Sequence, residues 1–166
     1  MAQNARGEIF IHSATAALCP HIEWAISAAV GAPAALDWTP QGAQPGTMRA
    51  ESIWEGDEGV CARIVSALMR CHRLRFEVTS QVRPGGFGER YSYTPALGVF
   101  HAVTDEFGDI QVSENRLRAA LSERGSGGRD VREAIDALLG APWDDELEIF
   151  RHAGDEAPVR WLHRAV

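Results

Sequence analysis

Hydrophobic and polar positions alternate with two different periods in the first half of the chain. Apolar residues at every second position predict strands, whereas apolar residues three or four positions apart predict helices. The predicted strands cover residues 8–13, 36–39, 48–55 and 73–83, and the predicted helices cover residues 20–30 and 57–71. The order β-α-β-β-α-β is typical of a ferredoxin-like split βαβ fold, in which two helices pack on one face of an antiparallel sheet.

The second half of the chain also shows both the strand period and the helix period of apolar residues. Strands are predicted at residues 90–94, 97–104, 109–112 and 159–166, and helices are predicted after Ser113, after Asp130 and after Pro142. The last helix places Trp143, Leu147 and Phe150 on one face. We expect this half to cover the second face of the sheet. Residues 5–83, the ferredoxin-like half, and residues 84–166, the hairpin and helical half, then form one α+β domain spanning 1–166.

Size and charge exclude several classes of protein. A chain of 166 residues with 45% hydrophobic residues can bury a core without metal or disulfide support. The net charge of the chain is −7. Its sixteen basic residues are all arginines, and they are scattered along the sequence. Nucleic-acid binding normally needs a basic stripe, so we expect no nucleic-acid partner. Three cysteines, an N-terminus without an apolar segment and no membrane-spanning stretch favour a cytoplasmic protein.

The segment Cys19-Pro20-His21 carries the clearest candidate chemistry. A cysteine at the start of a helix lies where the helix dipole favours a thiolate. The segment resembles the active-site start of thioredoxin-superfamily disulfide oxidoreductases. It departs from that family at Ile22, which stands where the family has its second cysteine. Any redox chemistry would therefore be monothiol, with His21 or His12 as the base for Cys19. The alternative is a partly buried cysteine beside an N-terminal proline, with His21 on the helix surface.

Other polar segments admit a ligand or a purely structural interpretation. The loop from Arg83 to Arg90 has two arginines that can bind an anionic ligand, although a hairpin connection between strands is the favoured interpretation. Asp144-Asp145-Glu146 is interpreted as a solvated start of a helix. No histidine or cysteine pair has the spacing of a metal site, so we expect no metal and no cofactor. His101 is interpreted as a core or edge histidine.

Six segments of the chain carry a resemblance to a known family: Leu18–His21, Glu23–Ala25, Leu36–Gln41, Leu74–Thr79, Glu89–Pro95 and Trp143–Leu147. Together they resemble an uncharacterised, largely actinobacterial family, the domain of unknown function numbered 3145. The resemblance implies no catalytic residues, and it implies a role beside enzymes of fatty-acid or acyl-CoA metabolism.

These observations favour a non-catalytic binding or regulatory protein, because no group of residues meets the requirements of an active site. Its partner would be another protein or a small anionic ligand. The alternative is a monothiol enzyme, thioredoxin-like or acyl-transferring, that uses Cys19. The sequence leaves the oligomeric state open.

Overall fold

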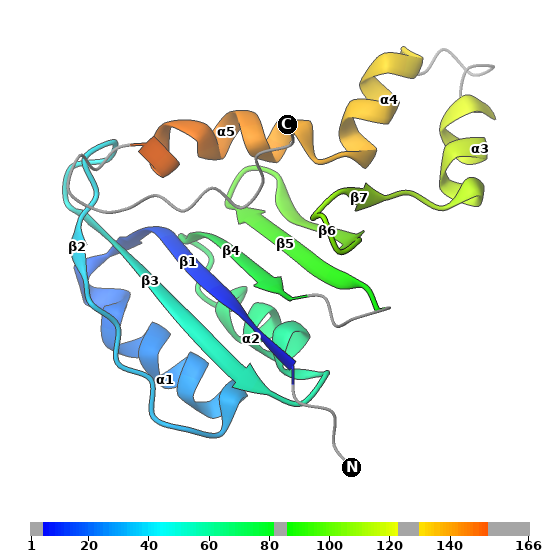
Figure 1. Ribbon diagram of the computed structural model, residues 1–166. Helices are drawn as coiled ribbons and strands as arrows, with labels where there is room; N and C mark the ends of the chain where they lie inside the picture. The colour runs from blue at the N-terminus through cyan, green and yellow to red at the C-terminus, as the bar shows by residue number, and fades with distance from the viewer. Residues whose placement is uncertain (1–4, 82–85, 123–129, 153–166) are drawn as a thin grey trace.

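The computed structural model describes residues 5–81, 86–122 and 130–152, which form one antiparallel sheet with helices on both faces (Figure 1). The strands are β1 (Ala5–Thr15), β2 (Thr39–Pro40), β3 (Thr47–Gly56), β4 (Arg75–Ser80), β5 (Gly88–Thr94), β6 (Gly98–Thr104) and β7 (Ile110–Gln111). The helices are α1 (Cys19–Val30), α2 (Val60–Leu68), α3 (Glu114–Ser122), α4 (Val131–Leu138) and α5 (Ala141–His152), with a 3₁₀ turn at Ala16–Leu18. The predicted α+β class is confirmed.

The strands lie in the order β2-β3-β1-β4-β5-β6-β7, and all pairs are antiparallel. Helices α1 and α2 pack side by side under β3, β1 and β4 (Figure 1). The core between these helices and the sheet contains mainly branched aliphatic side chains and one large aromatic ring. It includes Ile9, Ile11, Ile22, Ile26, Ile64, Leu68, Phe76 and Val78. The assignment of this half to the ferredoxin-like fold stays a prediction.

Helix α1 begins and ends as the sequence predicts. Pro20 lies in its first turn, where a missing backbone N–H costs no intrahelical bond. Gly31 ends it in the left-handed conformation, with φ of 80°. The following strand is shorter than predicted. Glu23 accepts hydrogen bonds from the Leu36 backbone N–H and from the Trp38 indole, so this segment is bound to α1 and only Thr39–Pro40 pair with β3.

The second half covers the sheet in a different way from the one expected. Strands β5, β6 and β7 extend the same sheet, because the outer edge of β4 offers unpaired backbone groups to β5. Among the described elements, only α5 packs across the second face, over β1 and β5 (Figure 1). The predicted strand at 159–166 lies outside the described residues.

Helices α3 and α4 contribute little to the core. Within the described residues, α3 has no buried side chain, and α4 buries only Ala134. They contact one another beside the β6–β7 end of the sheet, and α4 leads directly into α5 (Figure 1). None of the helices in the described part of the chain is both long and apolar enough to span a membrane.

Candidate functional site

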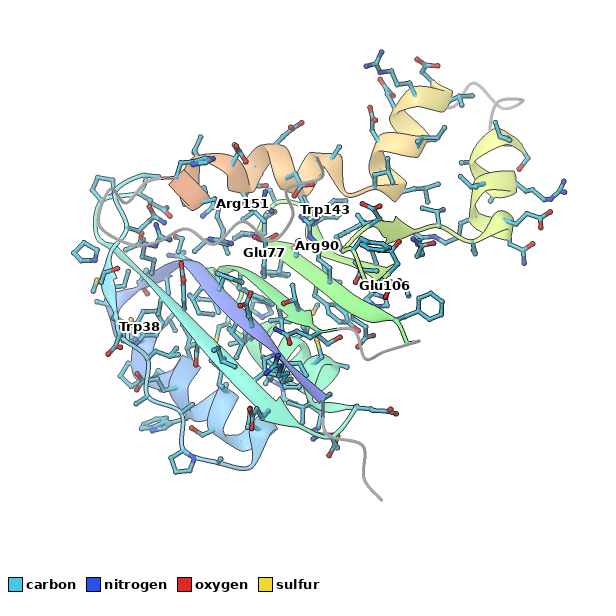
Figure 2. All side chains as sticks on the ribbon, viewed as in Figure 1. Trp38, Glu77, Arg90, Glu106, Trp143 and Arg151 are labelled. Carbon is cyan, nitrogen blue, oxygen red and sulfur yellow. The ribbon has the colours of Figure 1, made fainter. Side chains whose placement is uncertain are left out.

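A cluster of charged and polar side chains, the four on the sheet buried and the two on α5 partly buried, lies between the sheet and α5 (Figure 2). Strand alternation directs Glu77 of β4 and Arg90 and Ser92 of β5 toward α5, on the face opposite the apolar core. Helix α5 contributes the remaining acid and base. We call these residues the charge cluster: His12, Glu77, Arg90, Ser92, Asp144 and Arg151.

Glu77 is the centre of the charge cluster and is fully buried. Its carboxylate accepts hydrogen bonds from Arg151 Nε (3.0 Å) and Nη2 (2.5 Å) and from Ser92 Oγ (3.1 Å). It also lies 2.7 Å from His12 Nε2 and 3.4 Å from Arg90 Nη2. Two carboxylate oxygens offer about four acceptor sites. The acceptor capacity of Glu77 is therefore used within the protein, so it is not a free general base.

Burial alone would raise the pKa of Glu77. The hydrogen bond and charge of His12 and the charge of Arg151 outweigh burial, so the pKa of Glu77 lies well below its ordinary value of 4.5. The same pairing acts on the other partner. Glu77 and Asp144 overcome the effect of burial on Arg151 and raise the pKa of its guanidinium above the ordinary value. Both groups are therefore held in their charged forms.

The charge cluster fixes α5 on the sheet. Asp144, in the first turn of α5, pairs with Arg90 of β5 and, at 2.8 Å, with Arg151 further along the same helix. A second set of contacts lies alongside: Glu146 accepts from Arg75 Nε at 3.2 Å and from Thr94 Oγ1 at 2.8 Å. Apolar packing of α5 on the sheet comes from its buried side chains, Leu147 and Phe150. The polar contacts hold the N-terminal half of α5 against β4 and β5.

The interpretation of residues 144–146 as a solvated helix start is wrong for two of the three acids. Asp144 and Glu146 bind arginines on the sheet, because α5 lies across the strands instead of projecting into solvent. Asp145 is exposed. The predicted face of Trp143, Leu147 and Phe150 is confirmed as the side of α5 that contacts the sheet.

The low pKa of Glu77 predicts acid sensitivity. A carboxyl group whose pKa is lower in the folded than in the unfolded chain stabilises the fold above its unfolded pKa, and this stabilisation decreases as the pH falls below that value. We expect the free energy of unfolding in urea to fall between about pH 5 and about pH 3. The fall should be smaller in Glu77→Gln, which has no carboxyl group at this position. Equal slopes in the two proteins would contradict the low pKa.

The structure separates the residues proposed for a thiol enzyme. Cys19 and His21 lie in the first turn of α1, where His21 is exposed and contacts Trp24 edge-on. His12 lies on the opposite face of the sheet, under α5, because it alternates with the core residue Ile11 along β1, and its Nε2 lies 2.7 Å from Glu77. No hydrogen bond between described residues joins Cys19 to either histidine.

The Cys19 thiol also lacks the environment of a nucleophile. It is 9% exposed and its Sγ lies 3.7 Å from the Thr15 carbonyl oxygen. Burial is the main reason why its pKa lies above the ordinary value of 9.0, with Glu23 adding in the same direction. The helix dipole does not reverse this effect.

Alkylation measures this pKa directly. In a Cys61→Ala/Cys71→Ala chain, we expect the rate of iodoacetamide reaction at Cys19 to rise only above the pH at which a free peptide thiol ionises, because the buried thiolate is poorly solvated. A free cysteine peptide is the control. A midpoint below about pH 8 would instead support the monothiol enzyme.

The proposed anion site at the β4–β5 connection is only partly described. Arg83 lies outside the described residues. Arg90 is buried and pairs with Glu77 and Asp144, so its guanidinium serves the charge cluster and does not face a surface loop. His101, interpreted as a core or edge histidine, is exposed on β6, stacks on Tyr91 and lies 3.1 Å from Glu89.

An open pocket of about 550 Å³ lies where α4 meets α5. We call it the elbow pocket. Its apolar lining comes from the β5–β6 turn and from both helices: Ala96, Leu97, Ala137, Ala141, Pro142 and Trp143. Its polar lining consists of three carboxylates, Glu133, Asp136 and Asp145. Ligand sites in proteins commonly have this size and combine apolar walls with few polar groups.

Gly140 produces the bend that forms the elbow pocket. It adopts φ of 79° between the two helices, and a Cβ at this position would lie 2.7 Å from the Phe100 ring. The close approach brings Trp143 against Phe100, with ring centroids 5.2 Å apart. The Trp143 indole donates to the Gly98 carbonyl oxygen at 2.9 Å. The aromatic wall is therefore held in place by β6.

The elbow pocket contains three carboxylates. Glu133 and Asp136 are three residues apart on α4 and share a face, and Asp145 approaches from α5. None of the three has an ion-pair partner among the described residues. In the same part of the chain, no three His, Cys, Asp or Glu side chains are placed to hold a metal ion. Within residues 5–81, 86–122 and 130–152, the pocket therefore places negative charge without a paired cation beside apolar walls.

Comparison with known proteins identifies a family. The family model described as "Protein of unknown function (DUF3145)" matches residues 8–164, which include the charge cluster and the elbow pocket. No curated protein and no solved structure matches the chain. Since the match spans nearly the whole sequence, the chain belongs to the DUF3145 family.

Proposed function

We propose that this protein is a non-catalytic binding protein that recognises a basic segment of a partner protein in the elbow pocket. The observation that carries the proposal is the joint presence, in one open pocket, of apolar walls and three carboxylates without an ion-pair partner among the described residues. The carboxylate of Glu77, in contrast, is occupied by hydrogen bonds within the charge cluster, which acts by positioning α5. Recognition and support are thus divided between two neighbouring groups of residues.

The charge of the chain favours a basic partner over the anionic ligand suggested by Arg83 and Arg90. Its net charge of −7 attracts cations at long range, and the carboxylates of the pocket concentrate that attraction at one place. The pocket also offers accessible apolar surface, because its lining residue Leu97 is 41% exposed. A segment with alternating basic and apolar side chains matches both features. A cytoplasmic location and a link to fatty-acid or acyl-CoA metabolism belong to the same proposal.

Calorimetric titration with acetyl-Leu-Arg-Leu-Arg-Leu-amide tests this proposal. We expect binding that weakens as the salt concentration rises, and no binding of acetyl-Leu-Glu-Leu-Glu-Leu-amide. Glu133→Gln/Asp136→Asn should weaken binding about fivefold to tenfold, because each exposed ion pair contributes up to about 1 kcal/mol.

A matched control removes the same charge elsewhere. Asp37→Asn/Glu55→Gln replaces two exposed carboxylates that do not line the pocket. We expect it to retain most of the affinity. Equal losses in the two double variants would show general attraction by the net charge and would contradict a site in the elbow pocket.

A further inference from the structure

We propose that the elbow pocket selects arginine over lysine, so that the partner segment binds by inserting an arginine side chain. This inference rests on the proposed function, since it assumes that the pocket receives a basic segment. It adds the chemical identity of the inserted group. Three features of the pocket carry it: the carboxylates on two helices, the hydrogen-bonded Trp143 indole, and the apolar side chains of the lining.

The carboxylates approach the pocket from two sides. Glu133 and Asp136 belong to α4, and Asp145 belongs to α5. A guanidinium group carries five N–H donors in a planar fork and can bind acceptors on different sides at the same time. An ammonium group is a compact, strongly hydrated charge with three donors. Acceptors on two walls therefore suit the wider, planar cation.

Trp143 offers a ring surface instead of a hydrogen-bond donor. Its Nε1–H is already bonded to the Gly98 carbonyl oxygen, and its ring packs on Phe100. The indole is half-buried and lines the pocket (its position is labelled in Figure 2). Guanidinium groups stack on aromatic rings more often than ammonium groups do, and tryptophan is the most favourable ring. A fixed indole beside carboxylates is thus suited to a stacked guanidinium.

The remaining walls accept the aliphatic part of the side chain. Leu97, Ala137 and Pro142 provide apolar contacts for the methylene groups that carry the charged end. The volume of about 550 Å³ exceeds what one side chain fills, so a neighbouring residue of the segment enters with the arginine. This is why we infer a peptide segment as the occupant and not a free amino acid.

The test compares three peptides that differ at one position, acetyl-Leu-Ser-X-Ser-Leu-amide with X as arginine, lysine or citrulline. Citrulline has nearly the shape of arginine but no charge. Titrations followed by NMR should give an affinity for the arginine peptide about fivefold higher than for the lysine peptide. The citrulline peptide should bind about tenfold more weakly than the arginine peptide. We also expect nuclear Overhauser contacts between the arginine δ-methylene and the Trp143 ring.

Variants connect the preference to the pocket. Asp136→Asn should reduce the affinity for the arginine peptide severalfold, whereas Asp37→Asn, an exposed position outside the pocket lining, should leave it unchanged. Equal or tighter binding of the lysine peptide overturns the selection of arginine and leaves the proposed function standing. Equal binding of all three peptides, or binding of none at millimolar concentration, overturns both.

Discussion

Glu77→Gln is expected to lower the free energy of unfolding by about 3–5 kcal/mol. The substitution removes the central negative charge of the charge cluster, while Arg90 and Arg151 remain 7% and 12% exposed in their side chains. Breaking a buried ion pair from one side costs about this much, because the two arginines then share the single negative charge of Asp144 in a poorly solvated place. Urea unfolding at pH 7, followed by circular dichroism, measures the difference.

An exposed ion pair on α3 provides the matched control. Glu114 and Arg118 are 75% and 73% exposed in their side chains and pair at four residues' separation. Glu114→Gln is expected to change stability by no more than about 0.5 kcal/mol. If Glu77→Gln had an effect as small as that of Glu114→Gln, the charge cluster would not be what holds α5 on the sheet.

Gly7→Ala is expected to destabilise the fold by about 3 kcal/mol, at the upper end of the cost of overpacking. Gly7 lies in β1 opposite Trp54, whose indole passes over it to donate to the Thr79 carbonyl oxygen at 3.0 Å. A Cβ on Gly7 would overlap that carbonyl oxygen and lie 2.7 Å from Trp54 Nε1. The added methyl group would therefore displace β4, which carries Thr79, or the Trp54 indole. Thermal unfolding of the variant measures the loss.

A second glycine serves as a control, because a substitution there strains the backbone without causing a steric overlap. Gly31 has φ of 80°, and a Cβ added there would meet nothing within 4 Å, so Gly31→Ala introduces strain without overlap. We expect it to cost about 1–2 kcal/mol. A larger loss in Gly31→Ala than in Gly7→Ala would contradict the close packing of Trp54 against β1.

Local sequence patterns predicted most of the first half because each signal acts over a few residues. Pro20 and Gly31 mark the two ends of α1, and the alternation in 73–83 contains the observed strand β4, Arg75–Ser80. The pattern did not predict where β5 would pair, because an alternating strand extends a sheet or covers one equally well. The strand predicted at residues 36–39 is reduced to the two residues of β2, Thr39–Pro40, which the pattern did not predict. There, Glu23 satisfies groups that a strand would otherwise pair, and such a side-chain contact leaves no periodic signal.

The candidate site was less predictable, since it depends on residues far apart in the chain. Glu77 was recognised only as a polar position of an alternating strand, because its partner Arg151 lies 74 residues away. For the elbow pocket, the signal in the sequence was Gly140 between two predicted helices. A glycine at such a position predicts a bend of the chain, but it does not predict a cavity. The Cys19 motif left a thiol nucleophile and a partly buried cysteine as alternatives, and the 9% exposure of Cys19 agrees with the second.

The most direct test of the binding site is a titration of ¹⁵N-labelled protein with acetyl-Leu-Arg-Leu-Arg-Leu-amide, observed amide by amide. We predict that the largest shift changes occur at residues 96–98 and 133–145 and at the Trp143 indole N–H, and that they shrink in Glu133→Gln/Asp136→Asn. Changes centred on the first turn of α1, or the absence of any change at millimolar peptide, would contradict a binding site in the elbow pocket.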